Sequence, residues 1–220
     1  MTSSKDAIIA DIEKNKIILI LRGLTAEQLV RTVSAAADGG IRLVEVTFDQ
    51  SGTIPDAVTA ANIALLTRTF AGRVRVGAGT VLTTAQVRLA HTAGAEFIIS
   101  PDAYEPVITE TVRRGMVSIP GAFTPTECAN ASRWGADFVK LFPAAQVAPS
   151  YFRDLRAPLS HIRFLAVGGI TPNNMEDYAA AGACGFGIAN GIARRDDILT
   201  EDWPAVTARA RAYTSLLTNL

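Results

Sequence analysis

Short apolar runs alternate with longer amphipathic segments along almost the whole chain. The runs are rich in Val, Ile and Leu and predict eight strands, at residues 17–22, 42–47, 74–78, 96–100, 117–120, 137–141, 163–167 and 184–188. The Ala-rich segments predict helices at about 5–15 and at 25–38, 55–70, 84–93, 103–114, 124–134, 149–157, 172–181 and 203–218, with 149–157 the weakest pattern. Because the strand runs are apolar throughout, they indicate burial on both faces and parallel pairing.

Eight strand–helix units within 220 residues are typical of an α/β fold that closes into a single (β/α)8 TIM barrel. A doubly wound open sheet is the alternative, but the chain has no G-x-G-x-x-G fingerprint to support it. No linker or change of composition divides the sequence. We therefore expect one domain over residues 1–220, with a helix at about 5–15 and the barrel at about 17–218.

Charge and composition exclude several classes of function. Lys plus Arg and Asp plus Glu are both 21, so a net charge of zero predicts neither nucleic-acid nor membrane-surface binding. The chain start does not resemble a signal peptide, and Cys128 and Cys184 form no C-x-x-C pair, which favours a cytoplasmic protein. Because the chain has only His91 and His161, both expected to be structural or solvated, a multi-histidine metal site is not available.

The isolated lysine Lys140 carries the strongest chemical signal. Of 21 cationic residues only four are lysines, and the other three precede residue 17. Lys140 lies within the apolar run Phe138-Val139-Lys140-Leu141-Phe142, where desolvation would lower its pKa and leave a neutral amine. Such an amine can attack a carbonyl carbon and form a Schiff base. The alternative is a lysine that extends from a strand end into solvent.

Two further side chains lie at the carboxyl ends of predicted strands, where TIM barrels place their active sites. Glu45 interrupts an apolar run, and strand alternation could bring it to face Lys140 across the barrel. Its alternative is a structural pair with Arg42 or Arg163. Arg22 could bind a carboxylate, cap the rim, or pair with Glu45.

Glycine-rich loops follow the last two predicted strands, in the usual phosphate position of this fold. They contain Gly168-Gly169 and Gly187-Ile188-Ala189-Asn190. We interpret Gly168, Gly169 and Asn190 as candidate anion-binding residues, although such glycines also serve ordinary turns.

The run Gly135-Ala-Asp-Phe-Val-Lys140-Leu-Phe-Pro-Ala resembles the Schiff-base lysine motif of the 2-keto-3-deoxy-6-phosphogluconate / 4-hydroxy-2-oxoglutarate aldolase family. The run Gly40-Ile-Arg-Leu-Val-Glu45-Val-Thr47 resembles its glutamate motif, and the resemblance covers about residues 14 to 193. It implies a class I pyruvate aldolase that uses no metal and no other cofactor and is commonly a homotrimer. In this family Lys140 would form the imine and Glu45 would move protons. It also implies that Arg22 and Thr80 hold the pyruvyl carboxylate and that Pro101 and Phe142 line the pocket.

Two positions depart from that family's usual pattern. Asp49 stands where the phosphogluconate enzymes typically carry an arginine, and Ala189-Asn190 replaces a common Gly-Ser. An acid at position 49 would repel an anionic group. A substrate whose aldehyde portion is smaller or unphosphorylated is therefore an alternative to the family's usual substrate. The predicted activity is reversible cleavage of a 2-keto-3-deoxy sugar acid, either of the phosphogluconate type or 4-hydroxy-2-oxoglutarate. The products would be pyruvate and an aldehyde such as glyceraldehyde 3-phosphate or glyoxylate. The alternatives are a phosphate-binding barrel isomerase or synthase, and a non-catalytic barrel that binds a sugar acid.

Overall fold

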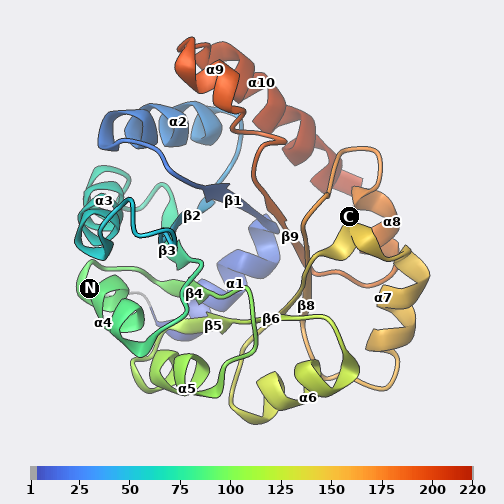
Figure 1. The fold of residues 1–220 in the computed structure, drawn as a ribbon. Helices are drawn as coiled ribbons and strands as arrows, with labels where there is room; N and C mark the ends of the chain where they lie inside the picture. Colours follow the sequence, from blue (N-terminus) through green and yellow to red (C-terminus); the bar gives the residue numbers. More distant parts are fainter. Residues whose placement is uncertain (1–3, 220) are drawn as a thin grey trace.

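The computed structural model describes residues 4–219, whose strands form one parallel sheet that curves into a barrel surrounded by helices (Figure 1). The strands are β1 (Ile17–Leu21), β2 (Leu43–Thr47), β3 (Arg75–Gly79), β4 (Phe97–Ile99), β5 (Val117–Ile119), β6 (Gly121–Ala122), β7 (Val139–Leu141), β8 (Phe164–Val167) and β9 (Gly185–Ile188). Their order is β5-β4-β3-β2-β1-β9-β8-β7-β6. The predicted TIM barrel is confirmed; residues 1–3 and 220 of the predicted domain lie outside the described range.

The barrel closes where a proline interrupts one predicted strand. The strand expected at 117–120 ends at Ile119 as β5, which pairs with β4. After Pro120 a separate strand that was not predicted, β6, pairs with β7. Proline has no N–H to donate to a ladder, which explains the break. Its carbonyl still accepts a hydrogen bond from the Lys140 N–H at 2.9 Å. Within residues 4–219 there are therefore nine strands rather than the expected eight, and the ladder continues past Pro120.

The helices occupy the expected connections. They are α1 (Lys5–Asn15), α2 (Ala26–Asp38), α3 (Asp56–Thr69), α4 (Thr84–Thr92), α5 (Glu105–Arg113), α6 (Pro125–Arg133), α7 (Pro149–Arg156), α8 (Met175–Ala180), α9 (Arg195–Leu199) and α10 (Trp203–Thr214), with 3-10 turns η1 (Ala144–Gln146) and η2 (Ser215–Asn219). Thr25 and Thr124 form capping boxes at the starts of α2 and α6. The helix predicted at 172–181 begins later in the structure. It is α8, and it follows a turn in which Asn174 accepts a hydrogen bond from the Thr171 N–H. The short elements α9 and η1 were not predicted.

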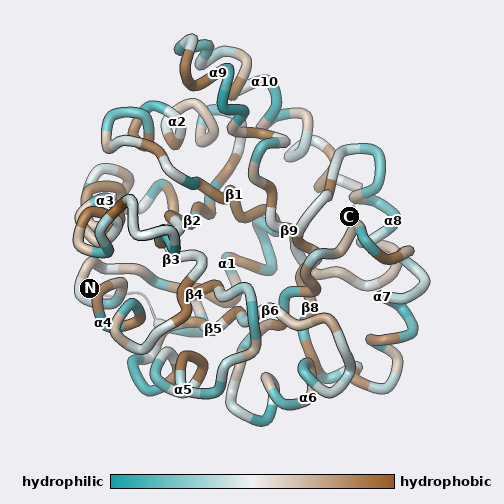
Figure 2. The backbone as a smooth tube through the Cα atoms, viewed as in Figure 1, coloured by the Kyte–Doolittle hydropathy of each residue, from teal (hydrophilic) through white to brown (hydrophobic). Residues whose placement is uncertain are grey.

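Apolar side chains fill two layers, one between the strands and the outer helices and one inside the barrel. The strands are mostly brown in Figure 2, whereas the outer helices mix brown and teal. Helix α1 lies across the ring of strands and packs Ile8 and Ile12 against the interior layer. One end of the barrel is thereby covered, which leaves the carboxyl ends of the strands for a site.

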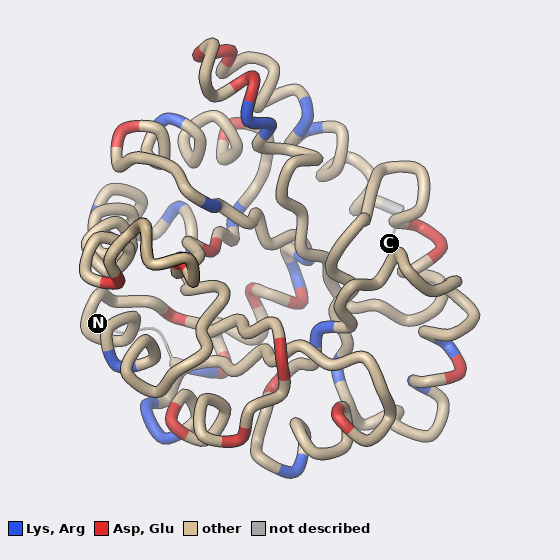
Figure 3. The backbone as a smooth tube through the Cα atoms, viewed as in Figure 1, with Lys and Arg blue, Asp and Glu red and all other residues tan. Residues whose placement is uncertain are grey.

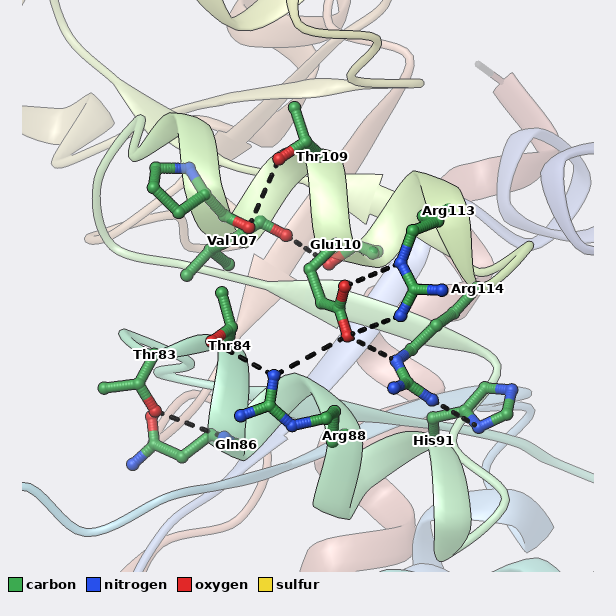
Figure 4. A network of polar contacts seen from close by, with 12 residues as sticks. Thr83, Thr84, Gln86, Arg88, His91, Val107, Thr109, Glu110, Arg113 and Arg114 are labelled. Carbon is green, nitrogen blue, oxygen red and sulfur yellow. Dashed lines mark hydrogen bonds and ion pairs between the residues drawn. The ribbon is translucent and has the colours of Figure 1, made fainter.

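Charged residues of both signs are spread along the outer helices (Figure 3). A cluster between α4 and α5 is centred on Glu110, which accepts from Arg113 at 2.9 Å and Arg114 at 2.8 Å (Figure 4). His91 Nδ1 lies 3.4 Å from Arg114 Nη1 in the same cluster, as expected for a structural histidine. None of the helices described is both long enough and apolar enough to span a bilayer.

Candidate active site

Glu45 and Lys140 line the same small cavity inside the barrel. Glu45 lies in the middle of β2 and is 2% exposed, and Lys140 lies in the middle of β7 and is 7% exposed. The cavity between them measures about 10 Å³ and is otherwise walled by apolar side chains and Gly187. This is close to the smallest space that holds one water molecule. The geometry therefore brings an acid and an amine to one enclosed and mostly apolar point.

Burial controls the charge of the glutamate. It raises the pKa of Glu45 from 4.5 to about 7, against the opposing influence of the Lys140 and Arg22 cations. The atom Oε2 is buried and has no hydrogen-bond partner. The structural pairs considered for Glu45 are not formed, because Arg42 donates to backbone carbonyls and Arg163 pairs with Glu13 at 3.3 Å. A carboxyl group poised between its two protonation states near neutral pH is suited to moving protons.

Gly79, at the end of β3, makes room for that carboxylate. A Cβ atom at Gly79 would lie only 2.4 Å from Glu45 Oε1 and 2.6 Å from its Cδ. The glycine backbone therefore packs directly against the acid and limits where it can move. Strand β2 pairs with β3 in a register that sets Thr47 beside Gly79, which brings the two segments together.

Lys140 is held as a poorly solvated amine. Burial lowers its pKa from 10.5, Glu45 raises it, and Arg22 lowers it further. Its Nζ atom lies 4.9 Å from the centre of the Phe142 ring. The alternative of a lysine extending into solvent is excluded by its 7% exposure. A lowered pKa increases the fraction of neutral, nucleophilic amine.

A polar chain connects the loops after β1, β2 and β3. Arg22 Nη2 donates to Thr80 Oγ1 at 3.5 Å, and Gln50 Nε2 donates to the Thr80 carbonyl at 2.8 Å. Thr80 has φ +54°, a left-handed conformation that a β-branched residue adopts only when its surroundings impose it. Gln50, which the sequence did not identify, therefore helps to hold Thr80 beside Arg22.

A larger cavity opens at the carboxyl ends of the strands. It measures about 820 Å³ and shares Ile20, Val167 and Gly187 with the small cavity. Five predicted site residues line it: Arg22, Phe142, Gly168, Gly169 and Asn190. Its volume lies in the range of small-molecule sites.

The glycine pair requires its residue type. Gly168 and Gly169 have φ +94° and +75°, and a Cβ at Gly169 would lie 2.4 Å from Ala145 Cβ. Only glycine accommodates that conformation and contact without strain. Both glycines line the larger cavity, and they do so with backbone atoms alone.

Some predicted residues lie elsewhere. Pro101 packs its carbonyl against Gly121, and neither Pro101 nor Thr80 lines either of these two cavities. Asp49 also lines neither, because it accepts from the Ser51 hydroxyl at 2.7 Å and the Ile54 N–H at 2.9 Å. These bonds hold the pKa of Asp49 at about 2, so it is an ionised loop anchor rather than a wall of the cavity.

The larger cavity also contains a residue that sequence reasoning missed. Arg195, at the start of α9, lines it beside Asn190. The sequence does show a cationic residue shortly after the last predicted strand. The helix that positions it, α9, has only five residues, which is too short for a helical periodicity of apolar residues to be recognised. Among the residues described, no group of three His, Cys, Asp or Glu side chains could hold a metal ion.

A TIM barrel that buries a lysine of lowered pKa beside an acid has the arrangement of enzymes that form Schiff bases with carbonyl substrates. Residues 8–209 match the family model described as KDPG and KHG aldolase. The chain belongs to this family, and it is a class I aldolase, a carbon–carbon lyase.

Individual relatives agree with this assignment. The chain is 37% identical over 177 residues to a probable 2-dehydro-3-deoxy-6-phosphogalactonate aldolase of Rhizobium meliloti, covering 80% of this chain and 81% of the relative. A native KDPGal structure is similar with a TM-score of 0.83 and 30% identity, covering 92% and 94% of the two chains. The KDPG aldolase of Legionella pneumophila, with pyruvate captured as a covalent carbinolamine, is similar with a TM-score of 0.80 and 25% identity, covering 92% and 96%.

Proposed function

We propose that this aldolase reversibly cleaves a phosphorylated 2-keto-3-deoxy sugar acid to pyruvate and an aldehyde, with Lys140 as the nucleophile and Glu45 as the proton carrier. The observation that carries this assignment is their shared interior cavity. The name of the Rhizobium meliloti relative supports a six-carbon phosphorylated substrate of the galactonate type.

The first half of the reaction forms an imine. The neutral Lys140 amine attacks the C2 ketone, and proton transfer gives a carbinolamine. Protonated Glu45 donates to its hydroxyl group, which leaves as water, so that a C2 iminium remains and Glu45 becomes a carboxylate. Because its pKa is about 7, Glu45 can serve as acid here and as base in the next step.

The second half breaks the C3–C4 bond. The Glu45 carboxylate removes the C4 hydroxyl proton, the aldehyde leaves, and the bond electrons move through C3 to the iminium nitrogen. The resulting enamine takes a proton at C3 from Glu45. Water then adds to C2, the pyruvate ketone forms again, and Lys140 is released as the free amine.

The remaining predicted residues bind the two ends of the substrate. Arg22 and Thr80 hold the pyruvyl carboxylate, and Phe142 covers the imine. Gly168, Gly169 and Asn190 bind the end that leaves as aldehyde, on the wall of the larger cavity. Pro101, which follows β4 and whose backbone carbonyl packs against Gly121, lines the pocket beside the pyruvyl group, as the family resemblance implies.

The test is borohydride reduction in the presence of pyruvate, followed by peptide mass analysis. We expect an adduct on the peptide that contains Lys140, and loss of both adduct and cleavage in Lys140→Met. Lys14→Met, which removes an exposed lysine from α1, is the matched control and should behave like the parent. An isomerase, a synthase or a sugar-acid-binding barrel would form no adduct, and cleavage that survived in Lys140→Met would overturn the mechanism.

The assembly and the compartment are part of the same proposal. The family resemblance supports a homotrimer that needs no metal or other cofactor and works in the cytoplasm. Sedimentation of the purified chain tests the trimer, and a monomer that is fully active would contradict it. Retention of activity after treatment with a metal chelator is the result expected for Schiff-base chemistry.

A further inference from the structure

The charge lining the larger cavity has one sign only. Arg22 and Arg195 both line it, and no aspartate or glutamate does. The chain as a whole has a net charge of zero, so this wall departs from the average surface. A cavity with cationic walls concentrates anionic ligands.

The two arginines that line the cavity come from different elements of the barrel. Arg22 follows β1 and donates to Thr80, at the part proposed to hold the pyruvyl carboxylate. Arg195 begins α9, beyond the loop that carries Asn190 after β9. A substrate that engages both would carry an anionic group at each of two separate positions.

Arg195 is available for a ligand. In the described part of the chain its guanidinium takes part in no ion pair or hydrogen bond within the protein. The nearby acid Asp197 is already paired with Arg209, which donates to it at 2.8 Å. The start of α9 is accordingly blue where the chain returns from β9 (Figure 3).

Neighbouring groups favour a phosphate at this place. Gly168 and Gly169 line the same cavity and hold their backbone in left-handed conformations, and the Asn190 amide, also in its lining, can donate. Asp49 lines neither cavity and is held in its own loop by the Ile54 N–H, so it contributes no carboxylate to this wall. Guanidinium groups bind phosphate through charge-assisted, often paired, hydrogen bonds.

We propose that Arg195 is a specificity-determining residue that binds the phosphate at the far end of the sugar acid. The inference rests on the proposed function and deepens it, because it selects phosphorylated over unphosphorylated substrates. It also assigns the selection to a side chain of α9 rather than to the loop after β2.

Arg195→Gln is the test, and Arg194→Gln is the matched control. Arg194 is the preceding residue, is also exposed, and does not line the cavity. With a phosphorylated six-carbon 2-keto-3-deoxy acid, Arg195→Gln should raise KM by roughly 10-fold, as expected for loss of one exposed charge-assisted hydrogen bond. The kcat of Arg195→Gln should stay near the parent value, KM for the unphosphorylated acid should not change, and Arg194→Gln should match the parent with both substrates.

Several outcomes would overturn the proposal. They are an unchanged KM for the phosphorylated acid, an equal rise for both substrates, or an equal effect of Arg194→Gln. A direct measurement keeps the test independent of catalysis: inorganic phosphate should bind the parent and Arg194→Gln more tightly than Arg195→Gln, measured by titration calorimetry. Failure of borohydride trapping in the parent would refute the aldolase mechanism, whereas normal trapping with equal phosphate binding in all three proteins would refute only the role of Arg195.

Discussion

Substituting Gly79→Ala tests whether the position of Glu45 limits the reaction. The added Cβ would lie 2.4 Å from Glu45 Oε1, whereas ordinary contacts are 3.4 Å or longer, so the carboxylate must retreat by about 1 Å. Gly79 is not in a left-handed conformation, and alanine therefore brings a steric conflict without backbone strain. A misplacement of about 1 Å typically costs around 100-fold in rate, which is about 3 kcal/mol in the activation barrier.

Two assays should distinguish an effect on Lys140 from an effect on Glu45. Lys140 is untouched, so borohydride trapping of pyruvate should persist in Gly79→Ala. Exchange of the pyruvate methyl protons with deuterated solvent, which needs Glu45 but no aldehyde, should slow together with kcat. Overpacking also lowers the free energy of unfolding by about 1–3 kcal/mol.

Gly115→Ala is the control for that loss of stability. Gly115 has φ +72° and open space around it, so alanine there strains the backbone far from Glu45. It should lower the melting temperature and leave kcat unchanged. If folded Gly79→Ala keeps the parent kcat and the parent exchange rate, the contact between Gly79 and Glu45 does not position the acid, and the reasoning is refuted.

Two further predictions concern Glu45 and Gln50. Burial raises the pKa of Glu45 from 4.5 to about 7, so the folded protein favours the protonated carboxyl. The free energy of unfolding is therefore highest below about pH 4.5, and it falls as the pH rises through 7 and the buried carboxyl must ionise. Glu45→Gln should therefore gain about 3 kcal/mol over the parent between pH 4.5 and pH 8 in urea unfolding, and a constant difference across that range would contradict the shifted pKa. Gln50→Leu removes the amide that donates to the Thr80 carbonyl at 2.8 Å. It should raise KM for pyruvate in the exchange assay several-fold, which corresponds to the free energy of about one hydrogen bond. Lys140 trapping at saturating pyruvate should be normal in Gln50→Leu, and an unchanged KM would show that Gln50 does not position Thr80.

The local pattern of the chain was enough to predict the elements and their order. Apolar runs separated by capped helices depend on neighbouring residues only, so the strands and the capping boxes at Thr25 and Thr124 could be read directly. Lys140 was visible for the same reason, as a lysine inside an apolar run. The split at Pro120 was the exception among the strands, because whether a proline ends or interrupts a strand depends on the partner across the ladder.

Contacts between distant segments were decided only by the tertiary structure. Gly79 lies against Glu45 because of the register in which β2 pairs with β3. Asp49 turns into its own loop because its carboxylate accepts a hydrogen bond from the Ile54 N–H. Arg195 reaches the cavity because the chain folds back after β9, which no local periodicity encodes. The sequence thus determined which reactive groups the protein has and on which strands they lie, since both follow from local composition. Their burial and neighbours, and through these the pKa values of Glu45 and Lys140, arise only when the barrel closes and removes water from its interior.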